Sequence, residues 1–197
     1  MDGLAGFLIA GIALTGSPGP ATLSLTATGA AFGLRRGLAY GAGITLGMLA
    51  VMALTAAGVV AFILALPGLA PLVTILVALY FLHLAFRIAT APPLAEAGRD
   101  SAAPSFAAGV ALSLVNPKGY AAMAALFSGF ALLPQQPAAE AGLKIGLLLL
   151  VIAAVNIVWL LAGSALTGLF RDPRSNRVVN LVFAALLLLS LAAAIRP

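Results

Sequence analysis

The chain has 197 residues, of which 63% are hydrophobic and only 8% are charged, and its formal net charge is +5. Ordinary soluble domains carry about 25% charged residues and bury only part of their apolar surface, so this composition predicts an integral membrane protein. The basic residues lie in short clusters between apolar runs, which is typical of membrane loops and argues against nucleic-acid binding. The absence of cysteine excludes disulfides, thiolate metal sites and a thiol–disulfide electron carrier.

Six apolar stretches are long enough to cross a bilayer, which takes about 20 helical residues. They are residues 3–34, two stretches within 37–86, then 106–133, 145–170 and 178–195. Proline-containing clusters at 67–71 and 134–137 predict two of the turns, and the polar residues 171–177 predict the last loop. We therefore expect an all-α membrane protein with six transmembrane helices. The first stretch is expected to be a span, because it is too long for a signal peptide and lacks a basic beginning.

The distribution of Lys and Arg predicts the orientation of these spans. The loops after spans one, three and five contain Arg35, Arg36, Arg87, Arg99, Arg171, Arg174 and Arg177. The opposite side contains only Lys144 and Arg196. The positive-inside rule then places the arginine-rich loops in the cytoplasm and both termini outside it.

A short pattern occurs twice, half a chain apart. Residues 10–15 read Ala-Gly-Ile-Ala-Leu-Thr and residues 108–113 read Ala-Gly-Val-Ala-Leu-Ser, and a proline follows each copy at Pro18 and Pro117. Three spans per half is an odd number, so the two halves would insert with opposite orientation. Chance similarity between Ala- and Leu-rich spans is the alternative, which the shared proline disfavours. The prediction is one transmembrane domain, 1–197, built of two inverted three-helix repeats, 1–98 and 99–197.

The prolines predict a break in the first and fourth helices. Proline removes one helical hydrogen bond and clashes with the carbonyl four residues earlier, which here would free the carbonyls of Leu14, Gly16 and Ser113. In a membrane, such groups are tolerated where they line a cavity or pack on protein. Paired interruptions in two inverted halves indicate a transporter's binding site, and the half-helices after each break would direct N–H groups at an anion. A simple kink is the alternative, although one proline would suffice for it.

Lys118 lies deep in the fourth predicted span, next to the break. A cation at that depth costs about 2.5–3.5 kcal/mol on insertion scales. The acidic residues fall at the termini or in predicted loops, at Asp2, Glu96, Asp100, Glu140 and Asp172. The Lys118 charge is therefore expected to be balanced by freed carbonyls or by a substrate carboxylate, with a purely structural cap as the alternative. Asn116 could equally bind a ligand or hold the unwound turn.

The third predicted span carries Tyr80, His83 and Arg87 on one helix face. His83 is the single histidine, so it is the candidate to carry a coupling proton near neutral pH. The alternative, which the position favours, is that His83 and Arg87 mark the cytoplasmic end of the span.

Other residues within the spans predict packing more than chemistry. Small-xxx-small patterns that permit close helix contact begin at Gly29, Gly37, Gly43 and Gly142. In the fifth span, Asn156 is polar at mid-membrane depth, whereas Trp159 is expected to pack.

These motifs together resemble the lysine exporter (LysE/RhtB) family of amino-acid efflux permeases. The resemblance covers nearly the whole chain and is carried by Pro18-Gly19-Pro20, Asn116-Pro117-Lys118 and the Gly33-Leu-Arg-Arg-Gly37 loop. It implies a six-span exporter of amino acids or related metabolites in the bacterial inner membrane, driven by protons. The sequence departs from the family at Ala21 and Met48, where polar or acidic residues are frequent.

The main hypothesis is therefore an amino-acid exporter that is embedded in lipid and able to form a homodimer. No enzymatic activity, cofactor, bound metal or nucleic-acid partner is expected. The exporter would work by alternating access and exchange its substrate for protons. An inorganic or metal-ion exporter is the alternative, disfavoured by the scarcity of metal ligands. A membrane-embedded enzyme and a structural or chaperone subunit explain the sequence less well. The residues expected to bind substrate are Ser17, Pro18, Gly19, Pro20, Thr22, Asn116, Pro117, Lys118, Tyr120 and Asn156.

Overall fold

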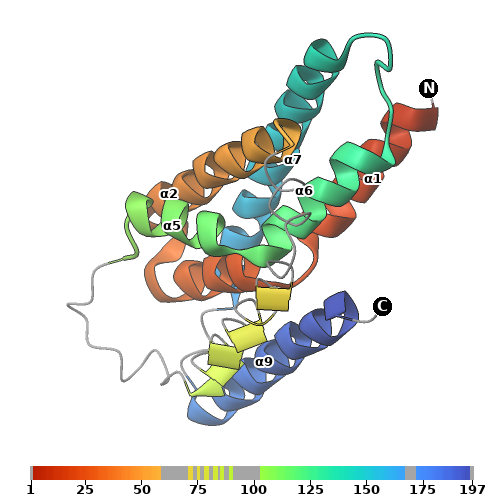
Figure 1. Cartoon of the computed structure of the whole chain (residues 1–197). Helices are drawn as coiled ribbons and strands as arrows, with labels where there is room; N and C mark the ends of the chain where they lie inside the picture. The colour runs from red at the N-terminus through yellow and green to blue at the C-terminus, as the bar shows by residue number, and fades with distance from the viewer. Residues whose placement is uncertain are drawn as a thin grey trace.

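The computed structural model describes residues 2–58, 103–166 and 172–195, together with residues 71–72, 75, 78–79, 82–83, 85–86 and 89–90. All the regular elements of these residues are helices, as the sequence predicted (Figure 1). They are α1 (Asp2–Gly16), α2 (Pro20–Ala56), α5 (Phe106–Val115), α6 (Pro117–Gly129), α7 (Pro137–Ala165) and α9 (Pro173–Ile195).

Helices α2 and α7 are each long and apolar enough to cross a membrane, and the bent pair α5–α6 makes a third crossing if it counts as one span. The chain is thus a multi-pass membrane protein. The predicted turn at 67–71 lies mostly outside the described residues, as does part of the third predicted span. Many large apolar side chains on the outer surface suit a lipid environment, among them Ile9, Leu150 and Val158.

Helix α2 folds back on itself at Gly33, within the predicted loop between the first two spans. Gly33 has φ 77° and ψ 169°, a backbone conformation that glycine adopts readily and other residues rarely do. The hydroxyls of Ser24 and Tyr40 are 2.6 Å apart although 16 residues separate them, a distance of about 24 Å along a straight helix. The two segments of α2 therefore lie side by side.

Glycines bring the backbones of neighbouring helices into contact. A Cβ atom on Gly29 would lie 2.2 Å from the Leu160 carbonyl oxygen of α7, and one on Gly43 would lie 2.1 Å from the Phe106 oxygen of α5. The close packing predicted for these two glycines is confirmed. A Cβ on Gly142, by contrast, meets no atom within 4 Å among the described residues.

The main buried core joins helices from both halves of the chain. Figure 1 shows α1 running beside α6, and their contact includes an edge-on pair of rings, Phe7 and Phe130, with centroids 5.7 Å apart. The buried side chains of this core come from α1, α2, α6 and α7, and they are Phe7, Met48, Val51, Met52, Ala122, Met123, Leu126, Leu148 and Ile152.

Two helices begin earlier than the hydrophobicity predicted. Helix α7 starts at Pro137 instead of 145, and α9 starts at Pro173 instead of 178, so the predicted loop 171–177 is largely helical. Both starts place proline in the first turn, where its missing N–H costs nothing. Asp172 accepts a hydrogen bond from the Ser175 backbone N–H at 2.8 Å, which caps α9 and lowers the pKa of this carboxyl. Glu140, predicted in a loop, lies in the first turn of α7.

Candidate functional site

The first helix breaks where the prolines predicted, between α1 and α2. The break is held by Gly19, whose backbone is extended and whose N–H donates to the Thr22 hydroxyl at 2.9 Å. The same hydroxyl lies 3.1 Å from the Gly19 carbonyl oxygen, to which it donates. Thr22 therefore satisfies the Gly19 N–H, which has no helical acceptor at the start of α2.

The second break lies at Asn116, between α5 and α6, where the two helices meet at a bend of 64°. Asn116 is 4% exposed, and its side-chain oxygen accepts the backbone N–H of Lys118 at 3.2 Å. Of the two roles considered for Asn116, the structure therefore supports the hydrogen bond that holds the unwound turn. Pro117 follows as the first residue of α6.

Lys118 joins the two breaks. Its Nζ donates to the backbone carbonyls of Ser17 at 2.5 Å and Pro18 at 3.1 Å, about a hundred residues away in sequence. Within the described part of the chain, the structure records no ion pair for Lys118. Main-chain carbonyls thus face its charge, but they belong to Ser17 and Pro18 and are not those that the prolines were predicted to free. Because an ammonium has three N–H donors, these two contacts leave one for another acceptor.

The carbonyls that the prolines free find other partners. The Leu14 oxygen accepts the Ser17 hydroxyl at 3.0 Å, and the Gly16 oxygen accepts the indole N–H of Trp159 at 3.2 Å. Sequence reasoning expected Trp159 only to pack and missed this bond. The signal available was general, since a buried indole N–H usually finds an acceptor.

Gly19 leaves the space that Lys118 occupies. A Cβ atom at Gly19 would lie 2.7 Å from Cδ and 2.9 Å from Nζ of Lys118. These separations are too short for non-bonded atoms, so any side chain at this position would displace the lysine. The break in the first helix is therefore shaped around the lysine of the second.

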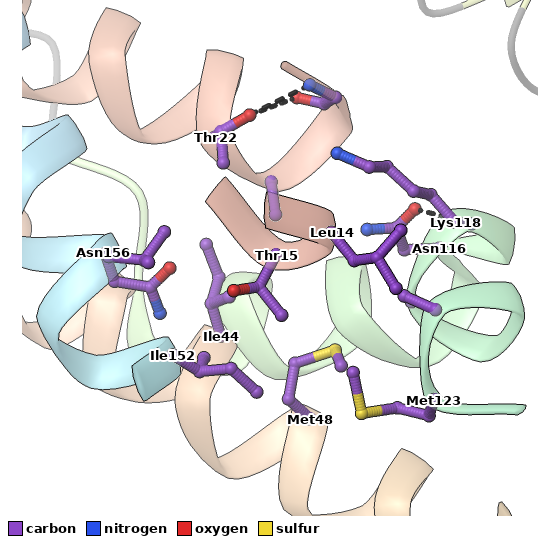
Figure 2. Close-up of a pocket in the computed structure, with 15 residues that line it drawn as sticks. Leu14, Thr15, Thr22, Ile44, Met48, Asn116, Lys118, Met123, Ile152 and Asn156 are labelled. Carbon is purple, nitrogen blue, oxygen red and sulfur yellow. Dashed lines mark hydrogen bonds between the residues drawn. The ribbon is translucent and has the colours of Figure 1, made fainter. Parts of the chain in front are cut away.

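A cavity of about 50 Å³ lies between the two breaks (Figure 2). Its polar lining comes from Thr15, Thr22, Asn116, Lys118 and Asn156. Its apolar lining includes Leu14, Ile44, Met48, Met123 and Ile152. This volume is far below the several hundred cubic ångströms of typical ligand pockets, so a substrate would need side chains or helices to move apart.

The predicted binding residues take different positions around this cavity. Those that line it are Gly19, Thr22, Asn116, Lys118 and Asn156. Ser17 and Pro18 contribute carbonyls to Lys118, while Pro20 and Pro117 begin the helices beyond the breaks. Tyr120 packs against the hydrophobic core and is not among the lining residues.

Of the three residues singled out in the third predicted span, the structure describes only His83. His83 is exposed and is not among the residues that line the cavity. Tyr80 and Arg87 lie outside the described residues.

Sequence reasoning missed three features of the described residues. Met48 was noted only as a departure from the family, and nothing in the sequence separated Met123 from core, yet both line the cavity. Thr45 accepts a hydrogen bond from the Asn156 side-chain amide at 3.0 Å, which joins α7 to α2. Lys144, expected at the outer surface, is instead 3% exposed and forms an ion pair with Glu140 at 2.7 Å. Its spacing of four residues from Glu140 was a usable signal.

The geometry defines what this site can hold. The ammonium of Lys118 and the N-terminal ends of α2 and α6 favour an anion such as a carboxylate. The carbonyls of Ser17 and Pro18 accept hydrogen bonds and would equally suit an ammonium group. No cluster of three His, Cys, Asp or Glu side chains occurs in the described ranges.

A multi-pass helical protein whose two broken helices meet around a lysine belongs to the class of membrane transporters. More particularly, the chain belongs to the LysE type translocator family, whose model matches residues 12–195. The predicted family is thereby confirmed, and the protein is a transporter and not an enzyme.

Relatives from enteric bacteria agree with this assignment. The chain is 34% identical over 175 residues to the cysteine/O-acetylserine efflux protein of Escherichia coli O139:H28, covering 87% of each chain. It is equally similar over 174 residues to the proteins of the same name from Escherichia coli K12 and Shigella sonnei, covering 87% of this chain and 86% of theirs. No solved structure matches the chain.

Proposed function

We propose that this protein exports amino acids, or closely related metabolites, across the bacterial inner membrane. The observation that carries the proposal is Lys118, a half-buried cation at the meeting point of two broken helices, whose ammonium contacts only carbonyls among the described residues. The efflux proteins named above supply independent support, since their names give an amino acid and an amino-acid ester as substrates.

In this proposal the substrate replaces contacts that the site makes with itself. The substrate carboxylate binds the Lys118 ammonium near the N-terminal end of α6, whose dipole favours an anion. As Lys118 turns towards that carboxylate, the carbonyls of Ser17 and Pro18 become available to the substrate ammonium. The exchange conserves hydrogen bonds, so no buried polar group is left without a partner.

Alternating access between two inverted three-helix repeats is the proposed transport mechanism. The packing of the described helices supports it, because the first part of each broken helix packs on a long helix of the other half. Helix α1 contacts α7, where a Cβ on Gly11 would lie 3.0 Å from Leu148, and α5 contacts α2, where the Ser113 hydroxyl donates to the Ile44 carbonyl. Rocking one half against the other would then expose the cavity to each side in turn.

Orientation and coupling are also part of the proposal. The arginine-rich loops support a cytoplasmic location for that side, with both termini outside. Proton exchange agrees with the direction of export, and His83 remains the candidate carrier even though it lies apart from the cavity. Dissipating the proton gradient should therefore stop export.

The proposal is tested by loading expressing cells with dipeptides and measuring free amino acids inside and outside. Wild-type protein should lower at least one amino acid inside the cells and raise it outside, whereas Lys118→Ala should not. Ser128→Ala is the matched control, since Ser128 is an exposed residue of α6 and not among the residues that line the cavity. Equal export by Lys118→Ala at equal abundance would refute the role of Lys118. If no amino acid moves with wild type, export of an inorganic ion becomes the function to test.

A further inference from the structure

The cavity has two chemically different ends. In Figure 2 Lys118 and Asn116 lie at one end, while the thioether groups of Met48 and Met123 lie together at the other. The polar end satisfies the carboxylate and ammonium that every amino acid shares. The opposite end is therefore the part of the site that can distinguish one amino-acid side chain from another.

Met48 lies close to the charged end as well. Gly119 follows Lys118 in the chain. The Met48 sulphur fills the space beside Gly119 and would be 3.1 Å from a Cβ atom placed on that residue. A substrate carboxylate bound by Lys118 would lie in the same cavity as the Met48 thioether. Met48 is 7% exposed and Met123 is fully buried, so both belong to the packed core and present a defined surface.

The surface formed by Met48 and Met123 provides no partner for a charge on the substrate's side chain. Among the described residues, none that lines the cavity is acidic, and Lys118 is the one cation. A basic or acidic substrate side chain would thus be desolvated against thioethers without a partner, which is strongly unfavourable. Apolar, thiol and ester groups would instead gain contacts with the polarisable methionine sulphurs.

We propose that Met48 and Met123 form the side-chain wall of the substrate site, and that Met48 restricts transport to amino acids with small uncharged side chains. This selectivity rests on the export function proposed above. An acidic residue at position 48 would supply the missing partner for a basic side chain and would disfavour an acidic one.

The test compares wild type, Met48→Glu and Met48→Leu in cells loaded with dipeptides of neutral, basic and acidic amino acids. Wild type and the similarly sized Met48→Leu should export neutral amino acids in preference to basic ones. In Met48→Glu the ratio of basic to neutral export should rise at least about tenfold, the change that one favourable charged contact commonly produces. An unchanged ratio in Met48→Glu, at normal abundance, overturns the proposal.

A second variant keeps the test decisive if Met48→Glu fails to accumulate. Met48→Ala enlarges the cavity beside the wall. Export of amino acids with larger uncharged side chains should therefore rise about 10-fold or more relative to those with small ones, the range for a few methylene groups in an apolar pocket. The same substrate order in Met48→Ala as in wild type would likewise overturn the proposal.

The same data separate this inference from the export function itself. If Lys118→Ala loses export while the Met48 variants keep the selectivity of wild type, only the proposal that Met48 and Met123 form the side-chain wall is refuted. If the wild type exports no amino acid, the proposed export function itself is refuted.

Discussion

Two lysines in this protein, Lys144 buried and Lys118 half-buried, solve the same electrostatic problem in different ways. Lys118 donates to the carbonyls of Ser17 and Pro18, and the structure records no ion pair for it among the described residues. Lys144 also donates to two carbonyls, of Phe127 at 3.0 Å and Phe130 at 2.5 Å, but it has Glu140 as a partner 2.7 Å away.

A carboxylate partner distinguishes Lys144 from Lys118, to which the proposed function gives a role in substrate binding. Glu140 also accepts the backbone N–H groups of Leu132 and Leu133, both at 3.1 Å, so this ion pair holds the connection between α6 and α7. Lys144 lines neither of the cavities found in the described residues. Lys118 faces a cavity with its charge offset by dipoles alone, and it can therefore still bind an anion.

The largest expected effect that tests this difference between the two lysines comes from removing Lys144. Lys144→Ala should lower the melting temperature of the detergent-solubilised protein by about 3–12 °C, because each hydrogen bond from a charged group contributes about 1.5–3 kcal/mol. Leu143→Ala is the neighbouring control, since Leu143 is 40% exposed. Export per folded molecule should persist at low temperature. A stable Lys144→Ala protein without export would show that the two lysines do not differ in role.

A second variant sharpens the role of Lys118 without removing it. Gly19→Ala places a methyl group where the lysine lies, and the flexible side chain should move away from the Ser17 and Pro18 carbonyls. Export should fall about tenfold or more, the cost of one charged hydrogen bond, with little change in melting temperature. Gly129→Ala is the control, since its Cβ would meet no described atom within 4 Å.

Combining Gly19→Ala with Lys118→Ala tests whether both act through one group. The double variant should export no less than Lys118→Ala alone, because the two changes remove the same interaction. Additive losses would instead mean that Gly19 serves transport independently of the lysine.

Neutralising the carboxylate of the structural pair should have a smaller effect. Glu140→Gln keeps one of the two oxygens that accept the Leu132 and Leu133 N–H groups, and it removes the charge that faces Lys144. Its melting temperature should fall by less than half as much as that of Lys144→Ala, with export unchanged. The measurement is thermal unfolding of both variants in the same detergent, and an equal fall would mean that charge pairing outweighs the backbone contacts.

The smallest expected effect concerns pH and the start of α9. The hydrogen bond from the Ser175 N–H lowers the pKa of Asp172 in the folded protein, so its stabilising contribution is complete above the unfolded pKa. It should disappear as the pH falls through the lower folded pKa. Asp172→Asn, which keeps the cap without titrating, should flatten this acid-side loss in a melting-temperature profile. An identical profile for wild type and variant would contradict the assignment.

Features that depend on backbone chemistry were predictable from sequence. Pro18, Pro20 and Pro117 dictate where helices must break, because a proline cannot complete the helical hydrogen-bond pattern wherever its helix lies. The position of Gly33 likewise fell inside a predicted loop. By contrast, the start of α7 was misplaced, because average hydrophobicity excluded Glu140 and Lys144 without considering that they could neutralise each other.

The sequence by itself determined that this is a helical membrane transporter with two broken helices and a lysine beside one break. Only the tertiary structure decided that Lys118 reaches the other break and that Met48 lies in the cavity. The physical reason is that a proline constrains its own backbone locally, whereas a side chain's partners depend on where helices cross. Those crossings are set by contacts such as Gly29 against Leu160, which join segments far apart in the chain.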